Sequence, residues 1–216
     1  MEQTYAIELK NITKRFGKIV ANDGINLKVK RGEILSLLGE NGSGKTTLMN
    51  MISGIYFPDE GRILVDGKAV SIRSPKDSFD LGIGMIHQHF KLIDVMTAAE
   101  NIILGLKGNA VLDMKKVHKD IQELVDRYGF DLDPAQKVYT MSVSQKQTVE
   151  IVKMLYRGAN ILILDEPTAV LTPQEVDKLF EVLRNMRDDG RAIIIITHKL
   201  NEVLELSDRV AILRKG

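Results

Sequence analysis

The 216-residue sequence contains no cysteine and no tryptophan, and only 5% of its residues are aromatic. Without cysteine it can form no disulfide, no thiolate nucleophile and no cysteine-bound zinc site. It also lacks an excess of charge of either sign, since 30 Lys and Arg stand against 29 Asp and Glu. A net charge near zero argues against binding through a broad basic surface, so we expect no nucleic acid partner.

Long apolar runs and a secretion signal are absent from the sequence as well. No run of about 18 consecutive apolar residues occurs, which is the length that a membrane-spanning helix needs. The first residues, MEQTYAIELK, lack the basic and then apolar arrangement of a signal peptide. We therefore expect a cytosolic α/β domain, for which 216 residues suffice.

Two kinds of strand pattern predict two sheets. Residues 5–30 alternate apolar and polar positions, which predicts a half-exposed antiparallel sheet broken by a turn at Gly17 and by the stretch around Asn22 to Gly24. A second antiparallel pair is expected in GRILVDGKAVSI, with a tight turn at Asp66-Gly67. In contrast, EILSLLG (33–39), NILILDEP (160–167) and AIIIIT (192–197) are nearly continuous apolar runs. Such runs are typical of parallel strands that helices cover on both faces, so the core is predicted to be a parallel sheet.

A helical region is predicted between the first and second of these apolar strands. In MKKVHKDIQELVDRYG the spacing predicts one buried helix face, made of Val117, Ile121, Leu124, Val125 and Tyr128. We interpret about 88–158 as an inserted helical subdomain, and 1–87 with 159–216 as the core. The last residues, DRVAILRKG, predict a further strand.

A phosphate-binding loop is the strongest motif in the chain. GENGSGKTT (39–47) matches G-x-x-x-x-G-K-[ST], follows a predicted strand and precedes a helical stretch. Gly42 and Gly44 allow the tight turn that directs backbone N–H groups at phosphate, Lys45 adds a point charge, and Thr46 offers a hydroxyl to Mg²⁺. The residues expected to contact the nucleotide here are Gly39, Asn41, Gly42, Ser43, Gly44, Lys45, Thr46 and Thr47. The alternative is a glycine-rich turn without a ligand.

Two adjacent carboxylates end the next apolar strand, in ILILDEPT. Asp165 and Glu166 would be costly at a buried strand end unless a cation or polarised water meets them. We predict that Asp165 binds Mg²⁺ and that Glu166 deprotonates the attacking water, the alternative being a solvated acidic turn. His198 ends the following apolar strand, so it should lie at the same sheet edge and reach the terminal phosphate. Lys45, Glu166 and His198 are the predicted catalytic residues.

These motifs occur in a familiar order. Together with Gln88 and MSVSQKQTVEI (141–151), the phosphate loop, ILILDEPTAVLT and ITHKL resemble the nucleotide-binding domain of ABC transporters over essentially the whole chain. The resemblance implies an ATPase of the P-loop type, with ATP and Mg²⁺ as cofactors. It implies that Phe16 stacks on adenine, and that Gln88 contacts Mg²⁺ and senses a membrane partner. The alternatives are a core position for Phe16 and a polar strand end for Gln88.

Longer stretches resemble the first half of fused, two-domain ATPases of simple-sugar and nucleoside importers, and PTAVLTPQEVDKLF points the same way. This resemblance implies a second ATPase domain, transmembrane permease subunits, an extracytoplasmic solute-binding protein and a peripheral location at the cytoplasmic face of the membrane. Leu171 and Thr172 would belong to the loop that crosses to the second domain. Phe90, Leu92, Ile93, Val95 and Met96 would line the groove for a permease helix, or else form core between subdomains.

The main alternative is a soluble ABC ATPase acting in translation or on DNA. The interval before residue 141 shows no sustained heptads of the kind that DNA-associated members carry, and the long charged linkers of translation members are missing. A regulatory domain that binds ATP without hydrolysing it is also an alternative, against which intact Glu166 and His198 argue.

The signature loop departs from the family pattern L-S-G-G-Q. Met141, Ser142, Val143, Ser144 and Gln145 occupy the five places, and Ser142, Ser144 and Gln145 are expected to face the partner domain's ATP. Ser144 replaces a glycine, so its side chain could crowd the nucleotide and would cost about 1 kcal/mol more if φ must be positive. The alternative is a structural role for Ser144, since SQKQ (144–147) matches a capping box that would open the following helix. When two domains pair, this chain's altered signature loop faces the partner's phosphate loop, whereas its own phosphate loop faces the partner's signature loop. We therefore predict one competent and one impaired ATP site.

Overall fold

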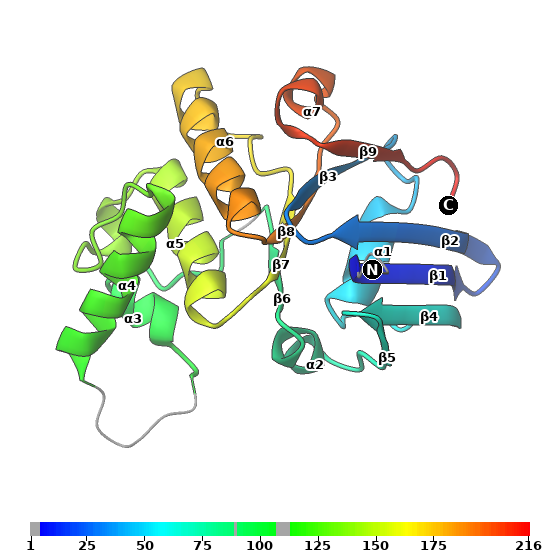
Figure 1. Cartoon of the computed structure of the whole chain (residues 1–216), viewed down its shortest axis with the longest axis horizontal. Coiled ribbons are helices and arrows are strands. Elements are labelled where there is room, and N and C mark those ends of the chain that lie inside the picture. The colour runs from blue at the N-terminus through cyan, green and yellow to red at the C-terminus, as the bar shows by residue number, and fades with distance from the viewer. Residues whose placement is uncertain (1–4, 89, 107–112) are drawn as a thin grey trace.

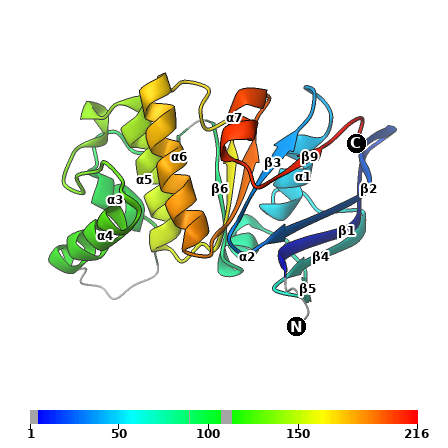
Figure 2. The same cartoon turned by 45° about the horizontal axis from the view of Figure 1, so that its top comes forward.

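A computed structural model describes residues 5–88, 90–106 and 113–216. Residues 1–4 of the predicted core, and residues 89 and 107–112 of the predicted helical subdomain, lie outside it. The strands are β1 (Tyr5–Phe16), β2 (Ile19–Lys30), β3 (Glu33–Leu38), β4 (Glu60–Val65), β5 (Lys68–Val70), β6 (Ile83–Ile86), β7 (Ile161–Asp165), β8 (Ala192–Ile196) and β9 (Arg209–Ile212). The helices are α1 (Lys45–Ile52), α2 (Pro75–Asp80), α3 (Ala98–Ile103), α4 (Met114–Tyr128), α5 (Val143–Tyr156), α6 (Pro173–Asp188) and α7 (Leu200–Leu206), with a 3₁₀ turn η1 (Val138–Thr140). In both views α3 and α4 lie farther from the sheets than α5 and α6 do (Figures 1 and 2).

The antiparallel sheet has the strand order β2-β1-β4-β5. The turn at Asp66-Gly67 is confirmed, and φ is positive at both residues (49° and 77°), as a two-residue hairpin turn requires. The predicted break of the sheet around Asn22 to Gly24 is wrong, because β2 continues through this stretch. Gly24, at φ 63°, forms an irregularity in the ladder instead, and its N–H donates to Thr13 Oγ1 at 3.0 Å.

The parallel sheet has the order β6-β7-β8-β3-β9 and contains the three predicted apolar strands at its centre. Alternate residues of these strands enter two hydrophobic clusters on opposite faces. Leu162, Leu164, Ile193 and Ile195 pack with α3 to α6, whereas Ile161, Ile163 and Ile194 pack with α1 and the antiparallel sheet. Burial on both faces explains why these runs read as continuously apolar.

The predicted face of α4 is confirmed, since Val117, Ile121, Val125 and Tyr128 are buried and Leu124 packs at its margin. Helix α6, from the second part of the predicted core, shares one hydrophobic cluster with α3, α4 and α5. The division at residues 88 and 158 therefore stays a proposal. No helix in the described part of the chain has both the length and the apolarity to cross a membrane.

Candidate functional site

The phosphate loop joins β3 to α1, and its glycines adopt conformations that other residues avoid. Gly42 and Gly44 have φ of 81° and 98°. A Cβ on Gly44 would lie 2.4 Å from the carbonyl oxygen of Ala21 and 2.7 Å from Asn22 Nδ2, both on β2. Gly44 is therefore required by the close approach of a neighbouring strand as well as by the turn.

Polar groups converge inside this loop. Lys45 is buried, and its Nζ donates to the carbonyl oxygens of Gly39 at 2.6 Å and Glu40 at 2.9 Å. Ser43 Oγ is also buried and has no hydrogen-bond partner within the described residues. Because α1 starts at Lys45, its first backbone N–H groups point into the loop with the positive end of the helix dipole. The loop can thus hold an anionic group of phosphate size.

The acidic pair lies where β7 ends. The backbone N–H of Glu166 donates to the carbonyl oxygen of Ile196 at 2.9 Å, which holds Glu166 in the left-handed region at φ 47°. Such strain in a non-glycine residue often accompanies a functional role. Burial, and after it the neighbouring Glu166 carboxylate, raise the pKa of Asp165 above its ordinary value. The Asp165 carboxylate is therefore in an environment that favours a nearby positive charge.

His198 lies at the same sheet edge, as the parallel strand order predicted. Its Nδ1 is 2.9 Å from Glu166 Oε1, and the ring is largely exposed. The sequence predicted proximity to Asp165 but not this direct hydrogen bond with Glu166. The bond accompanies the left-handed turn at Glu166, which none of the sequence patterns predicted.

One cavity of about 250 Å³ joins the two motifs. Its lining residues are Ile19, Val20, Ala21, Asn41, Gly42, Gly44, Lys45, Thr46, Thr47, Asp165, Glu166 and Ile196. Most of the predicted phosphate-loop residues and both carboxylates thus line one cavity, whereas Gly39, Ser43 and His198 do not line it. The contribution of Ile19, Val20 and Ala21 from β2 was missed, because strand residues carry no motif.

Gln88 approaches the same carboxylates from another side. A small crevice is lined by His87, Gln88, Asp165 and Glu166, among others. His87 was not predicted as a site residue, yet it lies beside Asp165. Its pKa is lowered, mainly because it is partly buried and secondarily by Lys91. Gln88 thus lines a crevice with the carboxylate pair, but it is not among the residues that line the cavity of Lys45 and Thr46.

Phe16 ends β1 at the tip of the hairpin that continues into Ile19 and Val20 of the cavity wall. It is 42% exposed, so the alternative of a core position is wrong. Phe16 itself does not line the cavity, but it pairs across the hairpin with Ile19, which does, and so it lies at the cavity's rim. An exposed aromatic ring at this place can stack on a flat ligand that extends from the phosphate loop.

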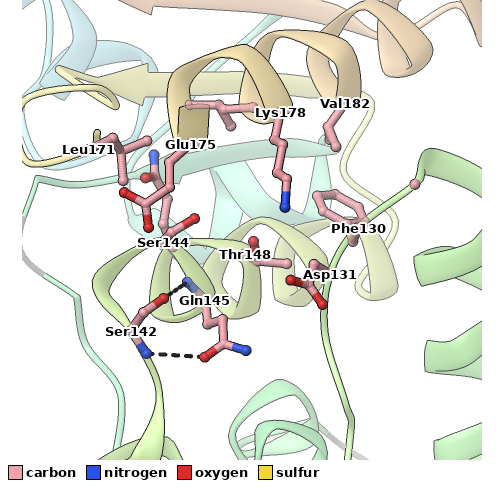
Figure 3. Close-up of a pocket in the computed structure, with 13 residues that line it drawn as sticks. Phe130, Asp131, Ser142, Ser144, Gln145, Thr148, Leu171, Glu175, Lys178 and Val182 are labelled. Carbon is pink, nitrogen blue, oxygen red and sulfur yellow. Dashed lines mark hydrogen bonds between the residues drawn. The ribbon is translucent and has the colours of Figure 1, made fainter. Parts of the chain in front are cut away.

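The predicted capping box at SQKQ is wrong, because helix α5 begins earlier. Its N-cap is Ser142, whose Oγ accepts from Gln145 N at 3.2 Å while Gln145 Oε1 accepts from Ser142 N at 3.1 Å (Figure 3). The helix starts at Val143, so Ser144 lies in its first turn. A capping box S-x-x-Q fits two overlapping frames here, and the tertiary structure selects the first.

Ser144 does not have a positive φ, so the predicted backbone cost does not apply. Its side chain extends into a groove of about 320 Å³ that α5 and α6 border, together with Thr148, Glu175 and Lys178 (Figure 3). The groove gives the Ser144 hydroxyl room within its own chain. We therefore expect a weaker effect of Ser144 on a facing nucleotide than the sequence alone suggested.

The structure also describes the two segments that were predicted to contact partners, at residues 171–172 and in 90–96. Leu171 lines the groove between α5 and α6, and Thr172 is the N-cap of α6 in a capping box with Glu175. In the predicted permease groove, Leu92 packs against the core, whereas Ile93 and Val95 are 39% and 73% exposed. Part of that segment is thus core, and part is a free apolar surface.

Comparisons with known proteins place these features in a family. Residues 22–169 match the family described as ABC transporter. The chain is 50% identical over 218 residues to the nucleoside import ATP-binding protein NupA of Lactococcus lactis, covering 100% of this chain and 43% of NupA. It is 53% identical over 214 residues to the guanosine import ATP-binding protein NupO of Bacillus subtilis, covering 98% of this chain and 42% of NupO. With the ribose import ATP-binding protein RbsA 2 of Escherichia coli O157:H7 it shares 44% identity over 218 residues, covering 100% of this chain and 43% of that protein.

Solved structures show the same fold. A nucleotide-free ATP-binding cassette from an ABC transporter superposes with a TM-score of 0.85 at 25% identity, covering 98% of this chain and 88% of that one. The structure of cbiO1 from Clostridium perfringens, part of the ABC transporter complex cbiONQ, gives 0.86 at 31% identity, covering 99% and 86%. The chain spans about two fifths of the length of the curated relatives it matches.

Proposed function

This chain belongs to the ABC transporter family, and we propose that it is the ATP-binding and ATP-hydrolysing part of an importer for simple sugars or nucleosides. The observation that carries the proposal is the single cavity shared by Lys45 and Thr46 of the phosphate loop and the carboxylates of Asp165 and Glu166. Phosphoryl transfer to water depends on positioned charge and on a base for the water, and these residues supply both.

The catalytic roles follow from where each group lies. Lys45 and the N-terminal amides of α1 neutralise charge on the phosphates. Glu166 accepts a proton from the attacking water, because its carboxylate borders the cavity beyond the phosphate loop. His198 holds Glu166 through the 2.9 Å hydrogen bond and can contact the terminal phosphate from the same edge.

Residues for a magnesium ion are present in the same place. Asp165, whose pKa is raised by burial and by Glu166, lines the cavity with the hydroxyl-bearing Thr46. A bound divalent cation would offset both causes, and oxygen ligands of this kind suit Mg²⁺. Thr46, Asp165 and Gln88 would hold the ion, which supplies charge neutralisation on the phosphates when bound. Phe16 at the rim would stack on the adenine.

The partners are proposed from the relatives that the chain resembles, whose names describe import of nucleosides, guanosine, glucose and ribose. These names favour an importer over a soluble ABC ATPase. We propose a second ATPase domain, fused or separate, that Ser142, Ser144 and Gln145 face. Transmembrane permease subunits, contacted through exposed Ile93 and Val95, and an extracytoplasmic solute-binding protein complete the assembly at the cytoplasmic face of the membrane.

The proposal is tested with Lys45→Ala in the complete transporter. Cells that depend on it for uptake receive radiolabelled guanosine or ribose, and ATP turnover of the purified protein is measured in parallel. We expect both uptake and turnover to fall at least about tenfold, because Lys45 stabilises transition-state charge. Lys119→Ala, on the exposed face of α4, is the matched control and should change neither. Parental uptake and turnover in Lys45→Ala would refute the proposed function.

A further inference from the structure

Phe16 does not stand alone at the rim of the nucleotide cavity. The ring of Tyr56 meets it edge to face, with centroids 5.2 Å apart and an interplanar angle of 73°. Phe16 and Tyr56 are 42% and 36% exposed, so neither ring is a core residue. An edge-on contact occupies one side of the Phe16 ring and leaves ring surface open to another group.

Tyr56 is fixed to the helix that begins at the phosphate loop. Helix α1 runs from Lys45 to Ile52, and just beyond its end the backbone N–H groups of Ile55 and Tyr56 both donate to the carbonyl oxygen of Asn50, at 2.9 and 3.1 Å. The backbone of Tyr56 is therefore tied by hydrogen bonds to the helix whose first turn belongs to the phosphate loop.

The same loop is also attached to the strand that carries Phe16. Asp59 accepts from the Arg15 backbone N–H at 2.6 Å and from Lys14 Nζ at 2.9 Å, while its own N–H donates to the carbonyl oxygen of Thr13 at 2.8 Å. The Lys14 ammonium lies 5.4 Å from the centroid of the Phe16 ring. These hydrogen bonds restrain the backbone of the strand just before Phe16 and of the loop just after Tyr56. Because the backbone that carries Phe16 is restrained, the contact with Tyr56 fixes the orientation of the Phe16 ring.

We propose that Tyr56 is a positioning residue for the nucleotide base: it holds the Phe16 ring at the distance from the phosphate loop that a purine nucleoside triphosphate spans. The inference rests on the proposed function. Tyr56 acts through Phe16, which alone touches the base. Its loss should therefore weaken recognition of the base and leave recognition of the phosphates unchanged.

The experiment compares binding of ATP with binding of inorganic tripolyphosphate, both with Mg²⁺, by displacement of a fluorescent ATP analogue. For Tyr56→Ala we expect the Kd for ATP to rise about 3- to 10-fold, the range that an aromatic pair contributes, and the Kd for tripolyphosphate to stay unchanged. Tyr56→Phe keeps the ring and should bind ATP like the parent. Phe57→Ala removes a ring of the same loop that is 46% exposed, and it is the matched control expected to have no effect.

A double variant separates positioning from direct contact. If Tyr56 acts through Phe16, the variant Phe16→Ala with Tyr56→Ala binds ATP no more weakly than Phe16→Ala alone. Additive losses would overturn the inference, as would parental ATP affinity in Tyr56→Ala or an equal loss of tripolyphosphate binding. Failure of the parent to bind either ligand would instead refute the proposed function, and the inference with it.

Discussion

Replacement of Glu166 by glutamine removes one charge and keeps the size of the side chain. The backbone bond from Glu166 N to the Ile196 carbonyl oxygen, 2.9 Å long, does not involve the side chain. An amide oxygen can still accept from His198 Nδ1, which lies 2.9 Å from the present carboxylate. The strand end should therefore keep its left-handed turn, and the change acts on charge and basicity alone.

The expected loss is one of turnover and not of binding. General-base catalysis contributes about 10² to 10⁴ in rate, so ATP hydrolysis should fall by that factor. The phosphate loop is untouched, so the Kd for ATP should stay within about twofold of the parental value. Phosphate release and displacement of a fluorescent ATP analogue measure the two quantities. Glu205→Gln, in an exposed ion pair with Arg184 on neighbouring elements, is the matched control and should change neither.

The same variant should alter the pH dependence of stability. Burial and Glu166 raise the folded-state pKa of Asp165 above its ordinary value of 3.8. Protonation of Asp165 then favours the folded state, so this contribution is present at low pH and is lost as pH rises through the raised pKa. Glu166→Gln removes the neighbouring charge, so the loss of stability with rising pH should be smaller in the variant than in the parent. Urea unfolding in a pH series that begins below the ordinary value of 3.8 and extends upward measures the difference between variant and parent.

Three results would refute this reasoning. Turnover at the parental rate would show that Glu166 is not the base. Loss of ATP binding would show that the side chain supports the phosphate site. A pH profile of unfolding identical to that of the parent would show that Glu166 does not act on Asp165.

Three other substitutions test separate parts of the structure. Gly44→Ala should lower the free energy of unfolding by about 1 to 3 kcal/mol and weaken ATP binding. It should do so more than Gly42→Ala, because of these two glycines only Gly44 would place a Cβ against the backbone of β2. Equal effects of the two variants on urea unfolding and on ATP binding would contradict this. Ser144→Gly should cost about 0.5 kcal/mol of stability, because it weakens the first turn of α5, and should leave turnover of the paired domains within about twofold. A tenfold gain in turnover would instead restore the idea of an impaired site. Tyr128→Phe should cost about 1 to 2 kcal/mol in urea unfolding, because it removes the 2.6 Å bond that joins α4 to Asp189 after α6, and an unchanged midpoint would refute that link.

The sequence by itself determined the parts of this protein that depend on neighbouring residues. The phosphate loop was recognisable because its glycines, Lys45 and Thr46 follow one another between a strand and a helix. The three central strands were recognisable because burial on both faces removes polar residues from the whole run. The meeting of Asp165 and His198 at one edge also followed, because parallel strands end together.

The tertiary structure decided what depends on residues far apart in the chain. Ser142 was chosen over Ser144 as the cap of α5, although both fit the local pattern. Glu166 took a left-handed turn because the end of β8 offers its N–H a carbonyl oxygen. Phe16 gained Tyr56 as a neighbour because α1 and the loop after it return to β1, a contact between residues 40 positions apart in sequence. Chain periodicity reports which face of an element is buried, but it holds no information on which distant side chain covers it.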